Sequence, residues 1–139
     1  MKVRTVAFLG LVALTACAAA PATRDPSGDW ELVSMNGGPA PAGVTLALRA
    51  PRLSGQAFCN SYGGAYAIRD GRLIAAAINA TRMACELRDP SVDPMAAEQT
   101  FLSILQARPV VSGAPARLVL RADDGSRLEF RAKPGSRAP

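Results

Sequence analysis

The side chains of this chain that can do chemistry are three cysteines and a small group of carboxylates, because the 139 residues include no histidine. This absence excludes Ser-His-Asp and Cys-His catalysis, histidine metal sites and the usual general base near neutral pH. A zinc site would have to use the cysteines. Gly63 and Gly64 lie between strand-like segments and open no helix, so they are not a phosphate loop. The sequence therefore predicts no metal site and no cofactor.

The carboxylates Glu86, Asp89, Asp93 and Glu98 gather around Cys85 and the start of a predicted helix. Two such groups at the right separation hydrolyse glycosides, which would suit a protein near a cell wall. In the structural interpretation Asp93 caps the helix, Glu98 favours its positive end, and Glu86 and Asp89 lie on a solvated loop. We favour the structural interpretation and expect no enzymatic activity.

Cys17 follows a sequence typical of an export signal. Lys2 and Arg4 precede an apolar run from Val6 to Leu14 that is too short to span a bilayer. The order Leu14-Thr15-Ala16-Cys17 resembles the lipobox of bacterial lipoproteins, which implies removal of residues 1–16 and acylation of Cys17 through its sulfur. The alternatives are an ordinary signal peptide with a chance cysteine, or a buried N-terminal helix.

The lipobox resemblance also implies a location. In Gram-negative bacteria an aspartate after the acylated cysteine retains a lipoprotein at the inner membrane, and this chain has Ala18 there. We therefore expect a lipid-anchored protein of the outer membrane that faces the periplasm, with the membrane as one partner. Loss of Lys2 and Arg4 leaves 14 of the 16 basic residues against 11 acidic ones, and lowers the net charge from +5 to +3. The basic residues are scattered, so nucleic-acid binding is not expected.

Cys59 and Cys85 remain once Cys17 carries lipid. In an oxidising compartment two remaining cysteines most simply form a disulfide. Closing a loop of this length stabilises a fold by about 3 to 4 kcal/mol in the chain-entropy model. Two free buried thiols are the alternative, and the spacing excludes a Cys-x-x-Cys redox site.

The rest of the chain is organised as one small domain. Residues 17–27 are small, polar and proline-bearing, as in a flexible tether; residues 28–132 form the domain, and residues 133–139 form a loose tail. Apolar alternation and turn signals predict strands over 28–33, 44–48, 52–57, 65–68, 72–75, 109–111, 117–121 and 127–131, with a turn-rich connection over 35–43. Asp70 and Gly71 predict a hairpin turn, and Leu118 and Leu120 are expected to pair with Leu128 and Phe130.

Residues 93–107 break this pattern and predict a helix. Asp93 can cap free backbone amides, and Pro94 suits the first helical position. One side of this helix carries Met95, Phe101, Leu102 and Leu105, which are expected to pack on a sheet. Many short strands and one helix predict a mainly β, α+β fold: a strongly curved antiparallel sheet or small β-barrel with the helix packed on it. The only tryptophan, Trp30, is expected in the core.

Three segments together resemble the META domain, the family of the bacterial heat-shock lipoprotein HslJ. They are Trp30-Glu31-Leu32, the segment 54–66 (SGQAFCNSYGGAY), and the segment 80–85 (ATRMAC) followed by Met95 and Glu98. The resemblance covers about residues 28–131. Phe58 departs from it, because a glycine usually precedes the cysteine; a non-glycine there suggests a backbone without positive φ. The resemblance implies a β-rich fold with one helix, envelope location, a link to heat or antibiotic stress, and no established enzymatic activity.

A candidate binding surface follows from the predicted disulfide, which would bring the segment after Cys59 close to the segment before Cys85. Its residues are Asn60, Tyr62, Tyr66, Thr81 and Arg82. Arg82 would then present a guanidinium beside Asn60 and an aromatic ring, as a contact for an anion or a peptide end. In the structural interpretation, which we favour, Arg82 packs and hydrogen-bonds within the bent sheet and Asn60 satisfies a turn.

Three functions remain. The preferred hypothesis is a non-catalytic outer-membrane lipoprotein that supports envelope integrity under stress through contacts with a protein or small ligand. The second is a periplasmic inhibitor or peptide-binding module, which an exposed loop-rich patch would favour. The third is a carboxylate-dependent hydrolase, which would need a deep acidic cleft with carboxylates about 5–9 Å apart.

Overall fold

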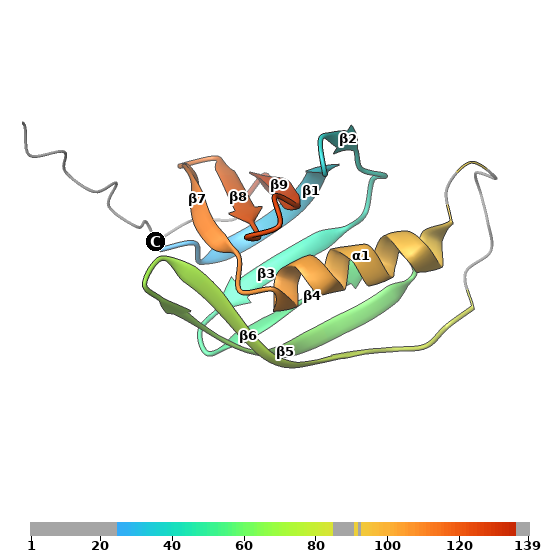
Figure 1. Ribbon diagram of the computed structural model, residues 1–139, viewed down its shortest axis with the longest axis horizontal. Helices are drawn as coiled ribbons and strands as arrows, with labels where there is room; N and C mark the ends of the chain where they lie inside the picture. Colours follow the sequence, from blue (N-terminus) through green and yellow to red (C-terminus); the bar gives the residue numbers. More distant parts are fainter. Residues whose placement is uncertain (1–24, 85–90, 92, 136–139) are drawn as a thin grey trace, which may run out of the picture.

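A computed structural model describes residues 25–84, 91 and 93–135 (Figure 1). Its elements are β1 (Gly28–Met35), β2 (Gly38–Pro39), β3 (Thr45–Arg49), β4 (Arg52–Ala57), β5 (Asn60–Arg69), β6 (Arg72–Ala80), α1 (Pro94–Gln106), β7 (Val110–Ala114), β8 (Arg117–Arg121) and β9 (Arg127–Ala132). The strands follow the order β2-β1-β3-β4-β5-β6-β7-β8-β9, and β1 also pairs with β9. This last pairing closes eight strands into an antiparallel barrel, with β2 as a short appendage on β1 and α1 packed on it. The predicted fold class is confirmed.

The strand pairing follows the apolar alternation of the sequence. In the β8–β9 hairpin Leu118 lies opposite Phe130 and Leu120 lies opposite Leu128, as predicted, and all four side chains are buried. Strands β5 and β6 are longer than predicted, because the segments 60–64 (NSYGG) and 76–80 (AAINA) carry no clear apolar alternation. The connection over 35–43 contains β2, a two-residue strand.

The core lies inside the barrel and under α1. Trp30 is buried, as predicted, and its indole N–H donates to the Pro26 carbonyl at 2.8 Å. The ring of Phe101, from α1, lies edge-on between Tyr62 at 5.5 Å and Phe130 at 6.4 Å between centroids. Such edge-to-face pairs add to the free energy gained by apolar burial. The helix is therefore joined to the barrel through its aromatic core.

Two hairpin turns contain residues with positive φ. Asp70 and Gly71 have φ of 51° and 71° and join β5 to β6, which confirms the predicted turn. Phe58 has φ 51°, so the expectation of a backbone without positive φ is wrong. Ala57 pairs with Asn60, so only Phe58 and Cys59 form the loop, and hairpin loops of two residues require positive φ at their first position.

Helix α1 begins as predicted. The Asp93 carboxylate accepts hydrogen bonds from the N–H groups of Met95 and Ala96, at 2.9 and 3.3 Å. The buried positions of the helix are Glu98, Phe101, Ile104 and Leu105. Met95 is 49% exposed, so its expected place on the packed face is wrong; it lies in the first turn, before the buried positions begin at Glu98. None of the helices in the described part of the chain is long and apolar enough to cross a membrane.

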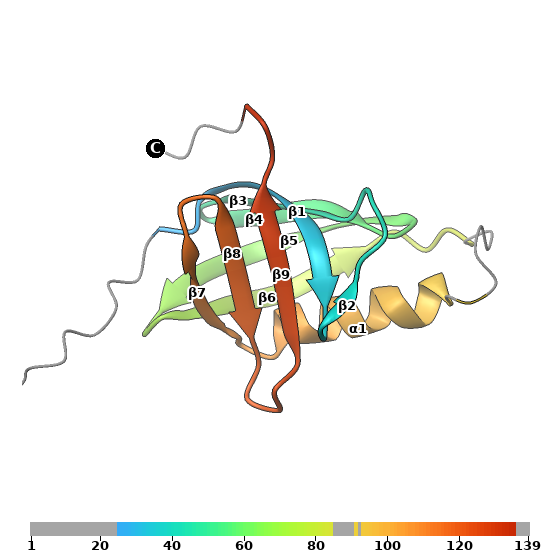
Figure 2. The same ribbon diagram turned by 90° about the horizontal axis from the view of Figure 1, so that it is seen from above.

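The barrel is least continuous between β6 and β7. The two strands share one residue pair, Arg72 with Val110, flanked by backbone hydrogen bonds from Leu73 to Pro109 and from Val111 to Gly71. Beyond this point β7 diverges from β6, and α1 lies alongside β6 (Figure 2). The side of β6 that faces away from β5 is therefore next to the helix for most of its length.

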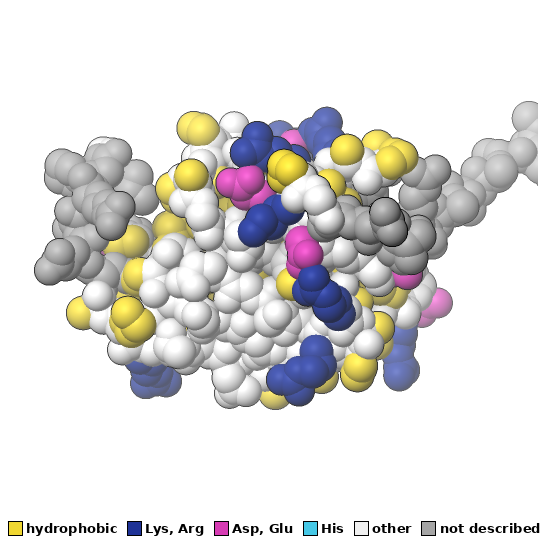
Figure 3. All heavy atoms as spheres, turned by 180° about the vertical axis from the view of Figure 1, so that it is seen from behind, with side chains coloured by type: hydrophobic (Ala, Val, Ile, Leu, Met, Phe, Trp, Pro, Cys, Tyr) yellow, Lys and Arg dark blue, Asp and Glu magenta, His cyan; other side chains and the backbone are white. Residues whose placement is uncertain are grey.

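Charged side chains of both signs are interspersed on the face of the molecule seen in Figure 3. Among the described residues the ion pairs are Arg49–Asp29, Arg72–Asp123, Arg117–Glu129, Arg127–Glu129 and Arg131–Glu31. Several of these pairs lie on strands β1, β8 and β9. Exposed pairs of this kind each contribute little to stability, at most about 1 kcal/mol.

Candidate functional site: a groove between α1 and β6

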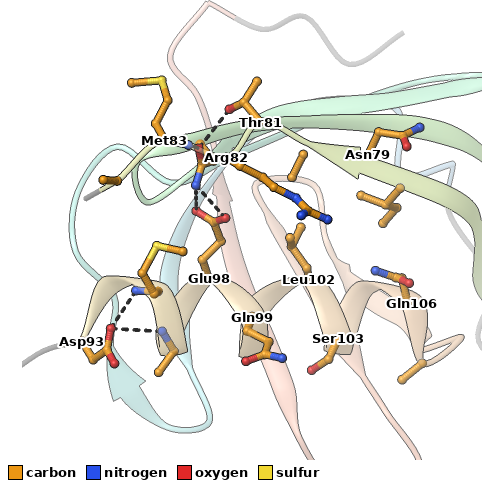
Figure 4. Close-up of a pocket in the computed structure, with 17 residues that line it drawn as sticks. Asn79, Thr81, Arg82, Met83, Asp93, Glu98, Gln99, Leu102, Ser103 and Gln106 are labelled. Carbon is orange, nitrogen blue, oxygen red and sulfur yellow. Dashed lines mark hydrogen bonds between the residues drawn. The ribbon is translucent and has the colours of Figure 1, made fainter.

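A groove of about 1220 Å³ separates α1 from the end of β6 (Figure 4). We call it the α1–β6 groove. Residues 78–84 form its strand side and Asn60 lies at its base; the helix side consists of Asp93, Met95, Ala96, Glu98, Gln99, Leu102, Ser103, Gln106 and Ala107. The groove exists because β7 leaves β6 after one residue pair, so that the helix, and not another strand, flanks this part of β6.

A buried polar network lies at the base of the groove. The Asn60 side-chain amide donates to both carboxylate oxygens of Glu98, at 2.9 and 3.1 Å. The Asn60 carbonyl oxygen accepts from the Thr81 hydroxyl at 3.0 Å and from the Met83 backbone N–H at 2.7 Å. One side chain thus links the start of β5, the segment after β6 and the helix.

Thr81 continues the sheet beyond β6. Its N–H donates to the Ser61 carbonyl at 2.9 Å, and its hydroxyl oxygen accepts from the Ser61 N–H at 3.1 Å. Within the described ranges, no buried side-chain nitrogen or oxygen lacks a hydrogen-bond partner. A network with all its partners in place is expected to fix the local conformation.

Glu98 was expected to interact with the positive, N-terminal end of the helix, but it is buried beyond the first turn. Glu98 is 6% exposed, and the first turn of α1 contains no acidic residue. It shares the buried side of the helix with Phe101 and Leu105, because residues three and seven positions apart lie on one face. No arginine or lysine nitrogen of the described chain lies within 4.0 Å of its carboxylate. The Asn60 amide is therefore its hydrogen-bond donor in this part of the protein.

Besides the polar network, the groove has a basic side chain and two large exposed apolar ones: Arg82, Met83 and Met95. The Arg82 side chain extends over Leu102 (Figure 4), and its guanidinium forms no ion pair or hydrogen bond with a described residue. Met83 and Met95 are 61% and 49% exposed, the highest values among the large hydrophobic side chains described. Met95 is the second residue of α1, and Met83 lies at the same end of the groove, near the start of the helix (Figure 4).

The structure brings together three of the five residues predicted as a binding surface. Asn60, Thr81 and Arg82 line the groove, but Thr81 and Met83, and not Arg82, bond to Asn60. Tyr62 and Tyr66 are 4% and 6% exposed and do not line it.

The two tyrosines belong to the barrel interior. The Tyr62 hydroxyl donates to the Thr45 carbonyl at 2.7 Å. Burial raises the pKa of Tyr62 far above its ordinary value. Burial also raises the pKa of Tyr66, against the opposing effect of a hydrogen bond from Ser27. Both hydroxyls therefore stay protonated well above neutral pH.

Cys59 lies half-buried in the turn between β4 and β5, next to Asn60, whose amide nitrogen is 3.8 Å from its sulfur. Cys17, Cys85, Glu86 and Asp89 lie outside the described residues. The acylation of Cys17, the Cys59–Cys85 disulfide and the roles of the two acids stay predictions.

Sequence reasoning did not identify the helix side of the groove. Gln99, Ser103 and Gln106 are polar and exposed, and nothing in their pattern distinguishes them from an ordinary solvated face. The position of Met95 was a usable signal. It lies in the first turn of a capped helix, before the buried positions begin, which favours an exposed side chain. The sequence placed that side chain in the core instead.

The carboxylates of the groove already have partners. Asp93 caps α1 and Glu98 accepts from Asn60. In the part of the chain that the structure describes, no three histidine, cysteine, aspartate or glutamate side chains are grouped to hold a metal ion. The groove therefore offers a guanidinium, amides, hydroxyls and two methionines, which suit binding through hydrogen bonds, charge and apolar contact.

Comparison with known proteins identifies a family and two similar folds. The family model for the META domain matches residues 23–135. A solved NMR structure of a protein from Burkholderia xenovorans is 28% identical, with a TM-score of 0.59 over 89% of this chain and 99% of that one. A second NMR structure is 22% identical, with a TM-score of 0.61 over 76% of this chain and 88% of that one, and shows likeness of fold. No curated protein matches.

Proposed function

The chain belongs to the META domain family, and on that premise we propose that it is a non-catalytic, lipid-anchored protein of the cell envelope that binds a partner in the α1–β6 groove. Binding there would support envelope integrity under heat or antibiotic stress. The observation that carries the proposal is the groove itself. It combines the guanidinium of Arg82, which pairs with no described residue, with the two most exposed large apolar side chains described, Met83 and Met95. Flexible methionines are typical of surfaces that adapt to a partner.

The state of the carboxylates supports a binding role over catalysis. A glycosidase needs two carboxyl groups that are free to exchange protons or attack the substrate. Asp93 and Glu98 instead hold the helix, through the amides of its first turn and through Asn60. A hydrolytic mechanism through these two residues would disrupt the contacts that position α1.

The anchor is the second part of the proposal. Cleavage before Cys17 would leave residues 17–27 as a tether between the lipid and β1, which begins at Gly28. Mass analysis of the membrane fraction should find a chain that begins at an acylated Cys17. Exchange of Cys17 for serine should release a folded domain from membranes, and an unmodified chain beginning at Met1 would refute the anchor. Nonreducing peptide mapping should find Cys59 linked to Cys85, and alkylation of both in the native protein would refute that bond.

The binding role can be tested in intact cells with a photoreactive amino acid at Gln99, which is exposed on the helix side of the groove. The matched control places the same amino acid at Ser54, which is exposed on β4 outside the groove. Illumination under heat or drug challenge should give a discrete adduct from position 99 and none from position 54. Equal labelling at the two positions, or none at 99, would overturn the groove as a binding site.

A further inference from the structure

One backbone edge of strand β6 pairs with another described strand at a single residue. On one side it pairs with β5 along its length, from Arg69–Arg72 to Tyr62–Ala80. On the other side, within the described chain, its only strand pair is Arg72 with Val110. The α1–β6 groove runs beside the last part of this edge, from Ile78 to Ala80, and continues to Ala84. Unpaired strand edges present backbone donors and acceptors to any extended chain that fits beside them.

A bulge interrupts this edge at Ala77, in the second half of β6. Ala77 has φ 48°, and the register with β5 shifts between Gly63 and Ala65. The Asn79 side-chain amide donates to the Ala77 carbonyl at 3.1 Å. Bulges are one of the usual means of blocking an edge, and here the Ala77 carbonyl is also occupied. The open part of the edge that lines the groove therefore lies after the bulge.

Ala80 is the central residue of the open part. Thr81 bonds to Ser61 on β5, through its own N–H and through its hydroxyl. Because the hydrogen-bonding direction alternates along an antiparallel strand, the N–H and C=O of Ala80 point away from β5. They point toward the groove that Ala80 lines, and neither bonds to a described residue. The next residue with this orientation is Arg82, whose guanidinium lies over Leu102 in the same groove (Figure 4).

We propose that the occupant of the groove is an extended peptide segment of a partner protein, which adds a strand to β6 at Ala80 and presents an acidic side chain to Arg82. This inference rests on the proposed function and names its partner class. Backbone hydrogen bonds to Ala80 supply affinity, as in other cases of strand addition. Side-chain contacts along the groove supply specificity.

Two features of the groove determine the expected peptide. Arg82 has no acidic partner among the described residues, so a carboxylate from the partner completes a charge-assisted pair. Met83 and Met95 provide an apolar end, where a large apolar side chain of the peptide is shielded from water. The peptide is therefore extended, with an apolar residue at the methionine end and an acidic residue close to it.

Selection of a displayed random-peptide library on the purified full-length lipidated chain tests this proposal. The selected peptides should combine an acidic and a large apolar residue, and should slow hydrogen exchange in the segment 78–82. Ala80→Pro removes the outward N–H without touching the bonds to β5, and should weaken binding by about tenfold or more. Arg82→Glu should weaken it similarly. Arg121→Glu, on exposed strand β8, is the matched control and should bind like the native chain.

The outcomes separate this inference from the proposed function. If Ala80→Pro lowers the melting temperature, its weaker binding could reflect unfolding. Hydrogen exchange of the segment 78–82 in the native chain, with and without peptide, then decides whether a strand is added. Groove-bound peptides that neither slow this exchange nor depend on Arg82 would overturn strand addition and leave the groove as a binding site. A lipid or small molecule as the adduct at position 99 would overturn the peptide partner. Absence of any adduct at position 99 would overturn both proposals.

Discussion

The side-chain amide of Asn60 lies within hydrogen-bond distance of both carboxylate oxygens of Glu98, at 2.9 and 3.1 Å. Asn60 is the first residue of β5, and Glu98 lies on the buried side of α1. Among the described residues this pair is a polar connection between barrel and helix, while the buried Phe101, Ile104 and Leu105 are apolar ones. The width of the α1–β6 groove depends on both, because α1 forms one of its sides.

Asn60→Ala should lower the free energy of unfolding by about 2 to 3 kcal/mol. It removes hydrogen bonds to a buried carboxylate and leaves the Met83 N–H and Thr81 hydroxyl without their acceptor. Asn79→Ala is the matched control, because the Asn79 side chain is exposed and, among the described residues, bonds only to the Ala77 carbonyl. It should cost about 0.5 kcal/mol or less. Urea unfolding measures both, and equal losses would show that the Asn60 network contributes nothing special.

Gly55→Ala should destabilise the barrel by about 3 kcal/mol or more, because a Cβ atom there would lie 2.1 Å from the Thr45 carbonyl oxygen and 2.7 Å from the Tyr62 hydroxyl. The backbone of β3 and the tyrosine would both have to move. Gly38→Ala is the control, since its Cβ would meet nothing closer than the Met35 carbonyl at 3.6 Å. Thermal unfolding should separate the two variants clearly; similar melting temperatures would contradict the close approach at Gly55.

The free energy of unfolding should fall as the pH rises above about 10. Burial raises the pKa of Tyr62 and of Tyr66, so the unfolded chain releases these protons while the folded chain keeps them. The stability contributed by these groups is therefore fully present below the ordinary tyrosine pKa and is lost above it. Tyr62 accounts for about 1.4 kcal/mol of this loss per pH unit, and Tyr66 adds to it. Tyr62→Phe should remove the Tyr62 contribution, so that the free energy of unfolding falls less steeply with pH above about 10. At neutral pH it should cost about 1 kcal/mol through the lost bond to Thr45. An unchanged slope in this variant would refute the assignment.

Asp93→Ala should cost about 1 kcal/mol of stability, because the N–H groups of Met95 and Ala96 lose their capping acceptor. Asp93→Asn should retain most of the stability, since asparagine caps nearly as well. Circular dichroism during urea unfolding measures both. An Asp93→Asn variant as unstable as Asp93→Ala would show that the charge, and not the cap, matters.

The fold was largely predictable because most of its elements carry local signals. Alternating Leu118, Leu120, Leu128 and Phe130 determine the β8–β9 register, and Asp93 with Pro94 marks the start of α1. Phe58 could not be predicted, because its positive φ follows from a two-residue loop and not from its own preference.

The site was less predictable because it depends on contacts between distant segments. Asn60 and Thr81 could be placed together, but the burial of Glu98 depends on how α1 packs against the barrel. The groove depends on β7 leaving β6 after one pair, which no local pattern signals. Tyr62 and Tyr66 alternate with small residues on β5, and only the closure of the barrel decides that both point inward.

Blocking the groove in living cells tests the account most directly. Ser103→Trp fills the groove from the exposed helix side, and Ser112→Trp places the same bulk on exposed strand β7, outside it. Both variants should fold and reach membranes at native levels, which melting temperature and fractionation verify. In cells that lack the native chain, Ser112→Trp should restore survival under heat or antibiotic challenge and Ser103→Trp should not. Full rescue by Ser103→Trp would contradict the groove as the working site of this protein.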